Sequence, residues 1–247
     1  MKEARDIQVI LTDLDGTLLD VDMDFFIPAY LEEMRQFGVR QGFLPEDTNL
    51  VPLVYDGTAA MFRRADNDQT NEQVFMERFF QDPWFGSRQE EARVFFNRFY
   101  EEVFPRLGHL CRPFPFAREV VQAMFDTGLP VALATSPVFP MSAIDARLEW
   151  AGVKDFPWLF KTAYDNMHTC KPRTVYYEEA ARMAGVRPEN CLMIGNDTLD
   201  DLSSGKIGMT TFLLEEAVLD RAKGANQPDY HGRAAELLAF LKNLRKA

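Results

Sequence analysis

The sequence predicts an α/β fold in which a doubly wound parallel sheet carries an inserted, mainly α-helical domain. Short apolar, β-prone segments recur along the chain, and segments of helical length separate most of them. One long stretch after the first predicted strand shows helical spacing of its apolar residues and no strand pattern. Strands that are apolar along their whole length belong to sheets covered on both faces, so helices are expected on both sides.

The predicted core alternates strands and helices. The strands are residues 9–12, 131–134 and 191–194, with a further strand within 207–214. The helices are residues 118–125, 141–150, 174–184 and 234–244, with another beginning near Thr198. The first three strands end in polar residues, and in parallel sheets of this kind sites lie beyond the carboxyl ends of the strands. We therefore expect those polar residues to meet at one edge of the sheet.

The stretch from Asp20 to Cys111 is rich in Phe, Glu and Arg and lacks a strand pattern. Its apolar residues form three stripes with helical spacing, which are Leu31, Met34 and Phe37; Phe75, Phe79 and Phe80; and Phe95, Phe96 and Phe99. Such stripes either pack the domain internally or line an aromatic substrate pocket, and we interpret them as internal packing. The predicted domains are therefore a core of residues 1–19 and 112–247 and an inserted helical cap of residues 20–111.

The composition limits the partners of the chain. Its 247 residues are 47% hydrophobic, which is ordinary for a soluble globular protein, and its formal net charge is −11. That charge repels nucleic acid and anionic membrane surfaces, so neither is an expected partner. The three cysteines have neither disulfide nor zinc spacing, and no signal peptide or membrane-spanning run is recognisable. We therefore expect a cytoplasmic protein.

Four short motifs carry residues that can do chemistry. Each has a structural interpretation by itself, as an Asp-Gly turn, a cap residue before a helix, a surface lysine or an acidic helix start. Carboxylates that converge on one point repel one another unless a cation or protons intervene, and oxygen ligands of this type suit magnesium better than zinc. The residues are Asp13, Asp15, Thr135, Lys171, Asp197 and Asp201.

In their order and separation these motifs resemble the haloacid dehalogenase (HAD) superfamily, in its phosphatase branch with a helical C1-type cap. The resemblance covers residues 8–17 and 114–214 and lies in the combination of the motifs. It implies a Rossmann-like core and hydrolysis of a phosphomonoester. By this resemblance Asp13 attacks phosphorus to form an aspartyl phosphate, Asp15 protonates the leaving oxygen and later activates water, and Thr135 holds a phosphoryl oxygen. A carboxylate nucleophile divides the hydrolysis into two easier steps.

The resemblance also implies a cofactor. Lys171 is expected to neutralise the phosphate and keep Asp13 ionised. Magnesium is expected to be held by Asp13, the backbone carbonyl of Asp15 and Asp197, while Asp201 orients Lys171 or contacts the water shell of the metal. Phosphoryl transfer depends mainly on positioning and charge neutralisation, which this set provides. The implied partner is a small phosphorylated metabolite.

Other reactions of the same superfamily fit the sequence less well. Its dehalogenases lack an aspartate two residues after the nucleophile, so Asp15 argues against dehalogenation, and its ion pumps have threonine there together with membrane spans. Phosphonate cleavage requires a lysine in the cap, and residues 20–111 contain none. A sugar-phosphate mutase and a non-catalytic protein that binds a phosphorylated ligand stay as alternatives, although Asp13 and Lys171 favour an enzyme.

Charged residues of the predicted cap offer a weaker signal. Asp22, Asp24, Arg63 and Arg64 either contact substrate at the entrance or are solvated charges on helices, and solvated charges are the commoner case. Cys170 is interpreted as a packing residue. The histidines have no metal-ligand spacing and are interpreted as structural or surface residues: His109, His168 and His231. The sequence specifies neither the phosphate ester nor the oligomeric state.

Overall fold

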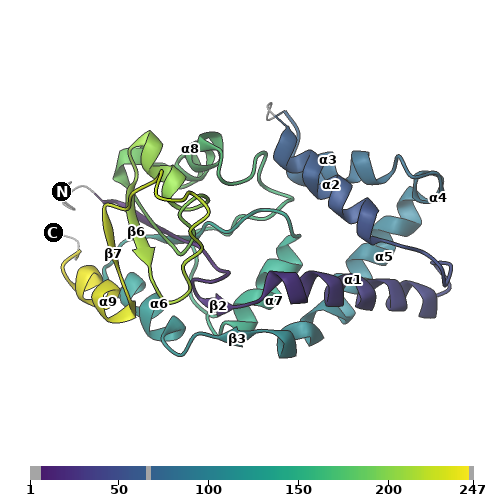
Figure 1. Ribbon diagram of the computed structural model, residues 1–247, viewed down its shortest axis with the longest axis horizontal. Coiled ribbons are helices and arrows are strands. Elements are labelled where there is room, and N and C mark those ends of the chain that lie inside the picture. The colour runs from purple at the N-terminus through teal and green to yellow at the C-terminus, as the bar shows by residue number, and fades with distance from the viewer. Residues whose placement is uncertain (1–6, 65–67, 245–247) are drawn as a thin grey trace.

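The computed structural model describes residues 7–64 and 68–244 and contains a five-stranded sheet (Figure 1). Its strands are β1 (Val9–Thr12), β4 (Val131–Leu133), β5 (Cys191–Gly195), β6 (Thr210–Leu214) and β7 (Tyr230–Gly232). The strand order is β4-β1-β5-β6-β7, and every neighbouring pair is parallel. Because β1 lies between β4 and β5, the three strands with polar residues at their carboxyl ends are adjacent. The predicted α/β class is confirmed.

Helices cover both faces of the sheet, and successive residues of each strand point to opposite faces. Ile10 packs in a cluster with α6 (Ala117–Asp126) and α9 (Ala234–Lys242) on one face. Leu11 packs in a cluster with α8 (Thr174–Met183) on the other. Burial on both faces explains why these strands are apolar along nearly their whole length.

Two details of the core differ from the sequence prediction. The helix expected from Thr198 is instead a 3₁₀ helix, η4 (Leu202–Ile207), because its Ser-Ser-Gly segment is a weak helix former. Another 3₁₀ helix, η3 (Pro188–Asn190), precedes β5. Strand β7 was not predicted, because its three residues lie at the sheet edge and are too short to show an alternating pattern.

The chain leaves the core through β2 (Leu19–Asp20) and returns through β3 (Arg112–Pro113), which pair antiparallel. The described residues between them form a helical lobe, to the right in Figure 1. Its elements are α1 (Met23–Arg40), α2 (Val51–Arg63), α3 (Asn71–Phe79), α4 (Pro83–Gly86), α5 (Gln89–Glu102) and η2 (Phe104–Leu110). In the part of the chain that the structure describes, no helix has the length and apolar character to cross a membrane.

Aromatic rings hold the lobe together and join it to the core. The ring of Tyr30 on α1 lies 5.8 Å from that of Phe99 on α5 and 5.7 Å from that of Phe104 on η2. Phe104 in turn stacks on Trp150 of α7 (Met141–Trp150), the helix that follows β4, at 5.2 Å between centroids. These buried rings account for part of the phenylalanine pattern of the sequence as packing of the lobe.

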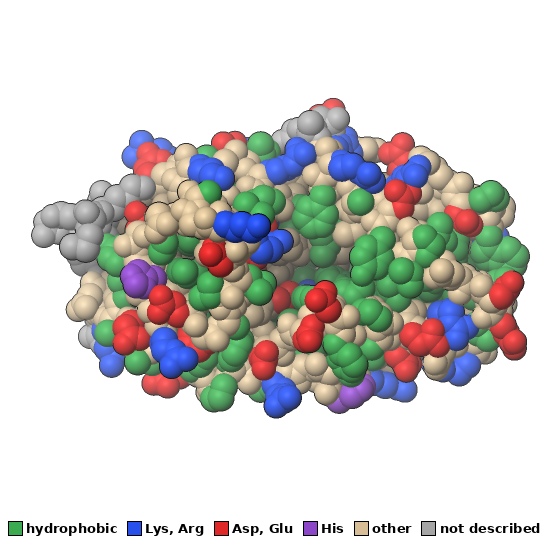
Figure 2. Space-filling model, viewed as in Figure 1, with side chains coloured by type: hydrophobic (Ala, Val, Ile, Leu, Met, Phe, Trp, Pro, Cys, Tyr) green, Lys and Arg blue, Asp and Glu red, His purple; other side chains and the backbone are tan. Residues whose placement is uncertain are grey.

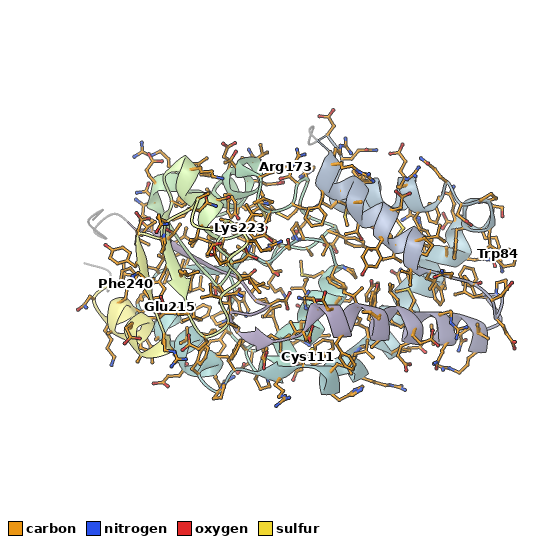
Figure 3. The ribbon with its side chains drawn as sticks, viewed as in Figure 1. Trp84, Cys111, Arg173, Glu215, Lys223 and Phe240 are labelled. Atoms are coloured by element: carbon orange, nitrogen blue, oxygen red, sulfur yellow. The ribbon has the colours of Figure 1, made fainter. Side chains whose placement is uncertain are left out.

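Polar contacts attach the other side of the lobe to the core. The side-chain nitrogen of Asn71, at the start of α3, donates to the carbonyls of Pro137 and Thr169, each at 3.2 Å. Arg173, labelled in Figure 3, donates to the carbonyl of Arg63 at the end of α2 at 3.1 Å. The lobe is thus bonded to two loops at the carboxyl edge of the sheet.

Phe99→Ala removes a fully buried ring from the lobe and should lower the free energy of unfolding by about 3–5 kcal/mol, because a cavity remains. Phe25→Ala is the matched control, since Phe25 is 60% exposed, and should change that free energy by less than about 0.5 kcal/mol. Denaturant unfolding followed by circular dichroism measures both. Equal losses in the two variants would contradict the packing of the lobe described above.

Candidate active site

The polar residues at the carboxyl ends of β1, β4 and β5 line one cavity of about 160 Å³. Asp13 follows β1, Thr135 lies just beyond β4, and Asp197 follows β5. The predicted site residues that line the cavity are Asp13, Asp15, Thr135, Lys171, Asp197 and Asp201. The structure therefore brings together every residue that the sequence analysis singled out for the chemistry.

Lys171 is the cation at the centre of this cavity. Its side chain is 1% exposed, and Nζ donates to Oδ1 of Asp13 at 2.8 Å and to Oδ1 of Asp201 at 2.6 Å. Burial by itself lowers the pKa of Lys171, but the two carboxylates outweigh that effect and hold the pKa well above its ordinary value. Lys171 is therefore a buried ammonium group that bridges two carboxylates.

Asp201 uses both of its carboxylate oxygens inside the protein. Oδ1 accepts from Lys171, and Oδ2 accepts from the backbone N–H of Asp197 at 2.9 Å. Burial raises the pKa of Asp201, and Lys171 opposes that effect. A Cβ at Gly195 would lie 2.1 Å from Oδ2 of Asp201, so only glycine leaves room for this carboxylate. Asp201 was expected either to orient Lys171 or to contact the water shell of a metal. The structure contains the first of these contacts, the hydrogen bond from Lys171.

The turn after β1 directs Asp13 into the cavity. The backbone N–H of Asp13 donates to the carbonyl of Ile194 at 2.9 Å, which continues the β1–β5 pairing beyond the strand. The hydroxyl of Thr17 lies 3.4 Å from Oδ2 of Asp13 and 3.1 Å from Oδ1 of Asn196. Gly16 has a φ of +77°, and a Cβ there would lie 2.2 Å from Nδ2 of Asn196. The Asp-Gly sequence therefore forms a turn, and this turn also directs the carboxylate of Asp13 into the cavity.

Asp15 pairs with Arg147, a residue of α7 that the sequence analysis did not single out. Arg147 is 2% exposed, and its guanidinium also lies over the ring of Phe139, 5.0 Å from the centroid. Burial lowers the pKa of Arg147 to about 10, so the group remains charged at neutral pH. The contact is made with Oδ2 of Asp15, whereas Oδ1 is buried without a hydrogen-bond partner among the described residues.

A second arginine joins the acidic residues after β5. Nε of Arg221 lies 2.5 Å from Oδ2 of Asp197, and Nη2 lies 2.5 Å from Oδ2 of Asp200. The other oxygen of Asp197 accepts from the backbone N–H groups of Leu199 and Asp200, at 2.8 and 3.0 Å. Burial by itself lowers the pKa of Arg221, but the two carboxylates raise it overall. Arg221 and these backbone donors thus offset part of the negative charge at this edge of the sheet.

Sequence comparison assigns the family. The family model of the haloacid dehalogenase-like hydrolases matches residues 7–207. The chain belongs to this family. The resemblance inferred from the order of the motifs is therefore confirmed, and the chain is an enzyme of the hydrolase class.

Curated relatives and solved structures agree with this assignment. Phosphoglycolate phosphatase from Vibrio vulnificus (strain YJ016) is 25% identical over 209 residues, which cover 84% of this chain and 83% of that protein. Pyrophosphatase PpaX from Bacillus cereus (strain AH820) is 23% identical over 243 residues, 98% of this chain and 99% of that protein. A HAD phosphatase structure from Thermococcus onnurineus aligns with a TM-score of 0.57 at 20% identity, covering 95% and 98% of the two chains. The L-2-haloacid dehalogenase structure from Xanthobacter autotrophicus has a TM-score of 0.54 at 14% identity, covering 96% and 98%. The structural likenesses support the HAD fold.

The charged residues named in the helical segment lie outside the lining of this HAD site. Oδ1 of Asp22 accepts from the backbone N–H groups of Asp24 and Phe25, so Asp22 caps α1. Arg63 pairs with Asp56 at the surface. The histidines each bond elsewhere, His109 to the Arg106 carbonyl, His168 to Glu179 and His231 to Glu215. Their interpretation as structural residues agrees with these contacts.

The donor chemistry of the site fits magnesium. Among residues 7–64 and 68–244, no three His, Cys, Asp or Glu side chains are already arranged around a metal position. The carboxylates of Asp13 and Asp197 and the backbone carbonyl of Asp15 are nevertheless the hard oxygen ligands that magnesium prefers. They share the cavity with Asp200, whose pKa is raised by burial. A divalent cation would relieve this crowding of acidic groups.

The sequence analysis missed both Arg147 and Arg221, but only Arg147 lies in a sequence pattern that could have indicated it. Arg147 shares a buried face of α7 with Ala143, Ile144 and Leu148, so an arginine inside an apolar helical stripe was a detectable signal. Arg221 lies in a loop, and no local pattern connects it with Asp197.

Arg147→Met should lower kcat by about 10–100-fold with a smaller change in KM, because Asp15 loses the group that orients it. Arg118→Met is the matched control, since Arg118 pairs with Asp155 at the surface, and it should leave kcat unchanged. Steady-state kinetics on both variants test this, and Arg147→Lys should recover part of the loss. Equal kcat values for Arg147→Met and the wild type would exclude a role of Arg147 in positioning Asp15.

The cysteines should be unreactive in the native protein. Burial raises the pKa of Cys111 to about 11 and those of Cys170 and Cys191 to about 12. At pH 8 a thiol with the latter pKa is ionised in only about one molecule in ten thousand, and the thiolate is the reactive form. Alkylation by iodoacetamide should therefore be slow until the chain is unfolded, and Cys170→Ala should keep its activity. Rapid native alkylation that abolishes activity would contradict a packing role for Cys170.

Proposed function

We propose that this chain is a magnesium-dependent phosphomonoesterase that acts on a small phosphorylated metabolite through an aspartyl phosphate on Asp13. The observation that carries the proposal is the buried contact of Lys171 with Oδ1 of Asp13. An adjacent ammonium group favours the ionised carboxylate that nucleophilic attack requires, and it offsets the charge of an incoming phosphate. The relatives named phosphatases support the same reaction class.

In the first step a carboxylate oxygen of Asp13 attacks phosphorus. The bond from phosphorus to the ester oxygen breaks, the electron pair stays on the leaving oxygen, and Asp15 donates a proton to it. Lys171 offsets the charge on the transferred group, and Thr135 at the end of β4 binds a phosphoryl oxygen. The products of this step are the free alcohol and the aspartyl phosphate.

In the second step water attacks phosphorus and the bond to Asp13 breaks, which releases phosphate and restores the carboxylate. Asp15 accepts the proton of the attacking water. Oδ1 of Asp15 is the oxygen suited to both transfers, because Oδ2 is held by Arg147 and Oδ1 has no partner among the described residues. The position of Asp15 in the cavity thus supports its two successive roles.

The metal belongs to this proposal as well. Asp13, the carbonyl of Asp15 and Asp197 would hold magnesium, which would neutralise charge on the phosphate when bound. Residues 20–111 would act as the cap over a core of residues 1–19 and 112–247, and Met23 of α1 already lines the cavity. We place the reaction in the cytoplasm, consistent with three free buried thiols in the chain.

Asp13→Asn should abolish phosphate release, by at least about a thousandfold, because the neutral amide cannot attack phosphorus. The assay is phosphate release from a panel of small esters that includes phosphoglycolate and pyrophosphate, with magnesium and with chelator. Release should require both the metal and Asp13. A variant that keeps magnesium-dependent activity would rule out this nucleophile, and transfer of phosphate to another hydroxyl without release would indicate a mutase.

A further inference from the structure

A second cavity, which we call the apolar cavity, lies between the helical lobe and the core. It has a volume of about 180 Å³ and is lined by side chains of α1, α2, α3 and α5 together with Val138, Phe139 and Tyr164. None of the described residues that line it is charged, and its only polar side chains are tyrosines and Thr58. Figure 2 shows hydrophobic side chains gathered around the hollow between the two parts of the molecule.

Two segments run from the active site into the apolar cavity. Residues 135–136 line the active site, and residues 138–139 of the same loop line the apolar cavity. On α1, Met23 lines the active site while Ile27 and Tyr30 line the apolar cavity. These three residues share one face of the helix, and a rise of about 1.5 Å per residue separates the first two by about 6 Å. The two cavities are therefore adjacent, at a separation that one small molecule can span.

Hydrogen bonds fix the apolar cavity beside the active site. The backbone N–H of Glu72 in α3 donates to the carbonyl of Tyr164 at 2.8 Å, and that of Asn71 donates to Met167, also at 2.8 Å. The side chain of Asn71 reaches the carbonyl of Thr169, two residues before Lys171. The helix that lines one wall is thus bonded to the segment that carries the catalytic lysine.

The cations of the active site are engaged with its own carboxylates. Lys171, Arg147 and Arg221 each pair with aspartates of the same cavity. Among the described residues that line the apolar cavity itself, none is a cation. Phosphoglycolate and pyrophosphate both carry a second anionic group, for which the apolar cavity offers no complementary charge.

Two hydroxyl groups that line the apolar cavity, those of Tyr30 and Tyr100, are engaged with each other. The oxygens of Tyr30 and Tyr100 lie 2.6 Å apart and bond to each other. Burial raises the pKa of both tyrosines, so both are neutral. The wall is therefore suited to hydrocarbon, and Tyr55, which lines the cavity and is 55% exposed, marks its opening to solvent.

We propose that the apolar cavity holds the leaving group of the substrate, and that this group is an uncharged alkyl or aryl alcohol about the size of a hexyl chain or a phenyl ring. The proposal rests on the phosphomonoesterase function proposed above and names its substrate class. An apolar cavity of about 150 Å³ binds benzene, so the volume is sufficient. The physiological substrate is accordingly the monophosphate of an apolar alcohol, with the phosphate as its sole anionic group.

The test is a series of straight-chain alkyl monophosphates, from ethyl to octyl, whose leaving alcohols have nearly the same pKa. With magnesium, kcat/KM for phosphate release should rise about three- to fourfold per added methylene and level off when the cavity is full. Phosphoglycolate and pyrophosphate should each give a lower kcat/KM than hexyl phosphate. A flat series, or a preference for phosphoglycolate or pyrophosphate over hexyl phosphate, overturns the proposal.

Two variants of helix α2 test whether the dependence of kcat/KM on chain length arises in the apolar cavity. Val54 of α2 lines the apolar cavity, whereas Val51 of the same helix is 44% exposed and does not. The hexyl-to-ethyl ratio of kcat/KM should fall at least tenfold in Val54→Trp and keep its wild-type value in Val51→Trp. An unchanged ratio in a folded Val54→Trp protein overturns the proposal, and the wild-type series decides it if that variant does not fold.

Comparison with Asp13→Asn distinguishes a failure of the phosphomonoesterase function from a failure of the proposed substrate class. If no ester in any series is hydrolysed, the phosphomonoesterase function fails and the substrate class fails with it. If hydrolysis persists undiminished in Asp13→Asn, the proposed reaction at Asp13 fails, and the substrate class, which rests on it, fails as well. If hydrolysis requires Asp13 but is indifferent to chain length, only the substrate class is wrong.

Discussion

The site depends on one buried ammonium group. Lys171 lies between Asp13 and Asp201 at the edge of the sheet where several aspartates converge, and like charges at that density repel one another. Lys171 is almost fully buried, so burial without partners would favour its neutral form; the two carboxylates reverse that preference. Lys171 therefore stabilises the charge of both carboxylates, and they stabilise the charge of Lys171, so the ionised state of Asp13 depends on this ion pair.

The fold supplies the geometry that this triad requires. Strand β1 lies between β4 and β5, which brings Asp13 beside the residues that follow both neighbours. Gly16 and Gly195 then allow Asn196 and Asp201 to approach closer than any side chain would permit. Ion pairs also stabilise the aspartates that Lys171 does not contact, because Arg147 pairs with Asp15 and Arg221 pairs with the two aspartates after β5. Charge balance at the carboxyl edge is thus built from three separate parts of the chain.

The sequence predicted what depends on local pattern. Apolar strands and amphipathic helices gave the α/β class, and the order of the acidic motifs gave the site residues that the structure brings together. Strand β7 was missed because three edge residues carry no periodicity, and η4 was expected as a helix although Ser203 and Gly205 disfavour one. Arg221 and the apolar cavity were missed because they arise from tertiary contacts between segments distant in the sequence.

Reaction and substrate choice reside in different parts of this molecule. The buried charged residues at the carboxyl edge of the sheet are constrained by charge balance, because replacing Asp15 leaves Arg147 without its carboxylate and replacing Lys171 leaves Asp201 without its cation. The helices of the lobe carry no such constraint, because none of the described side chains that line the apolar cavity is charged. Under the substrate class proposed above, substitutions there would change which alcohol fits without disturbing the carboxylates. Relatives of this family can therefore share the sheet and the acidic residues and still act on different esters, so the substrate in a relative's name does not carry over with the fold.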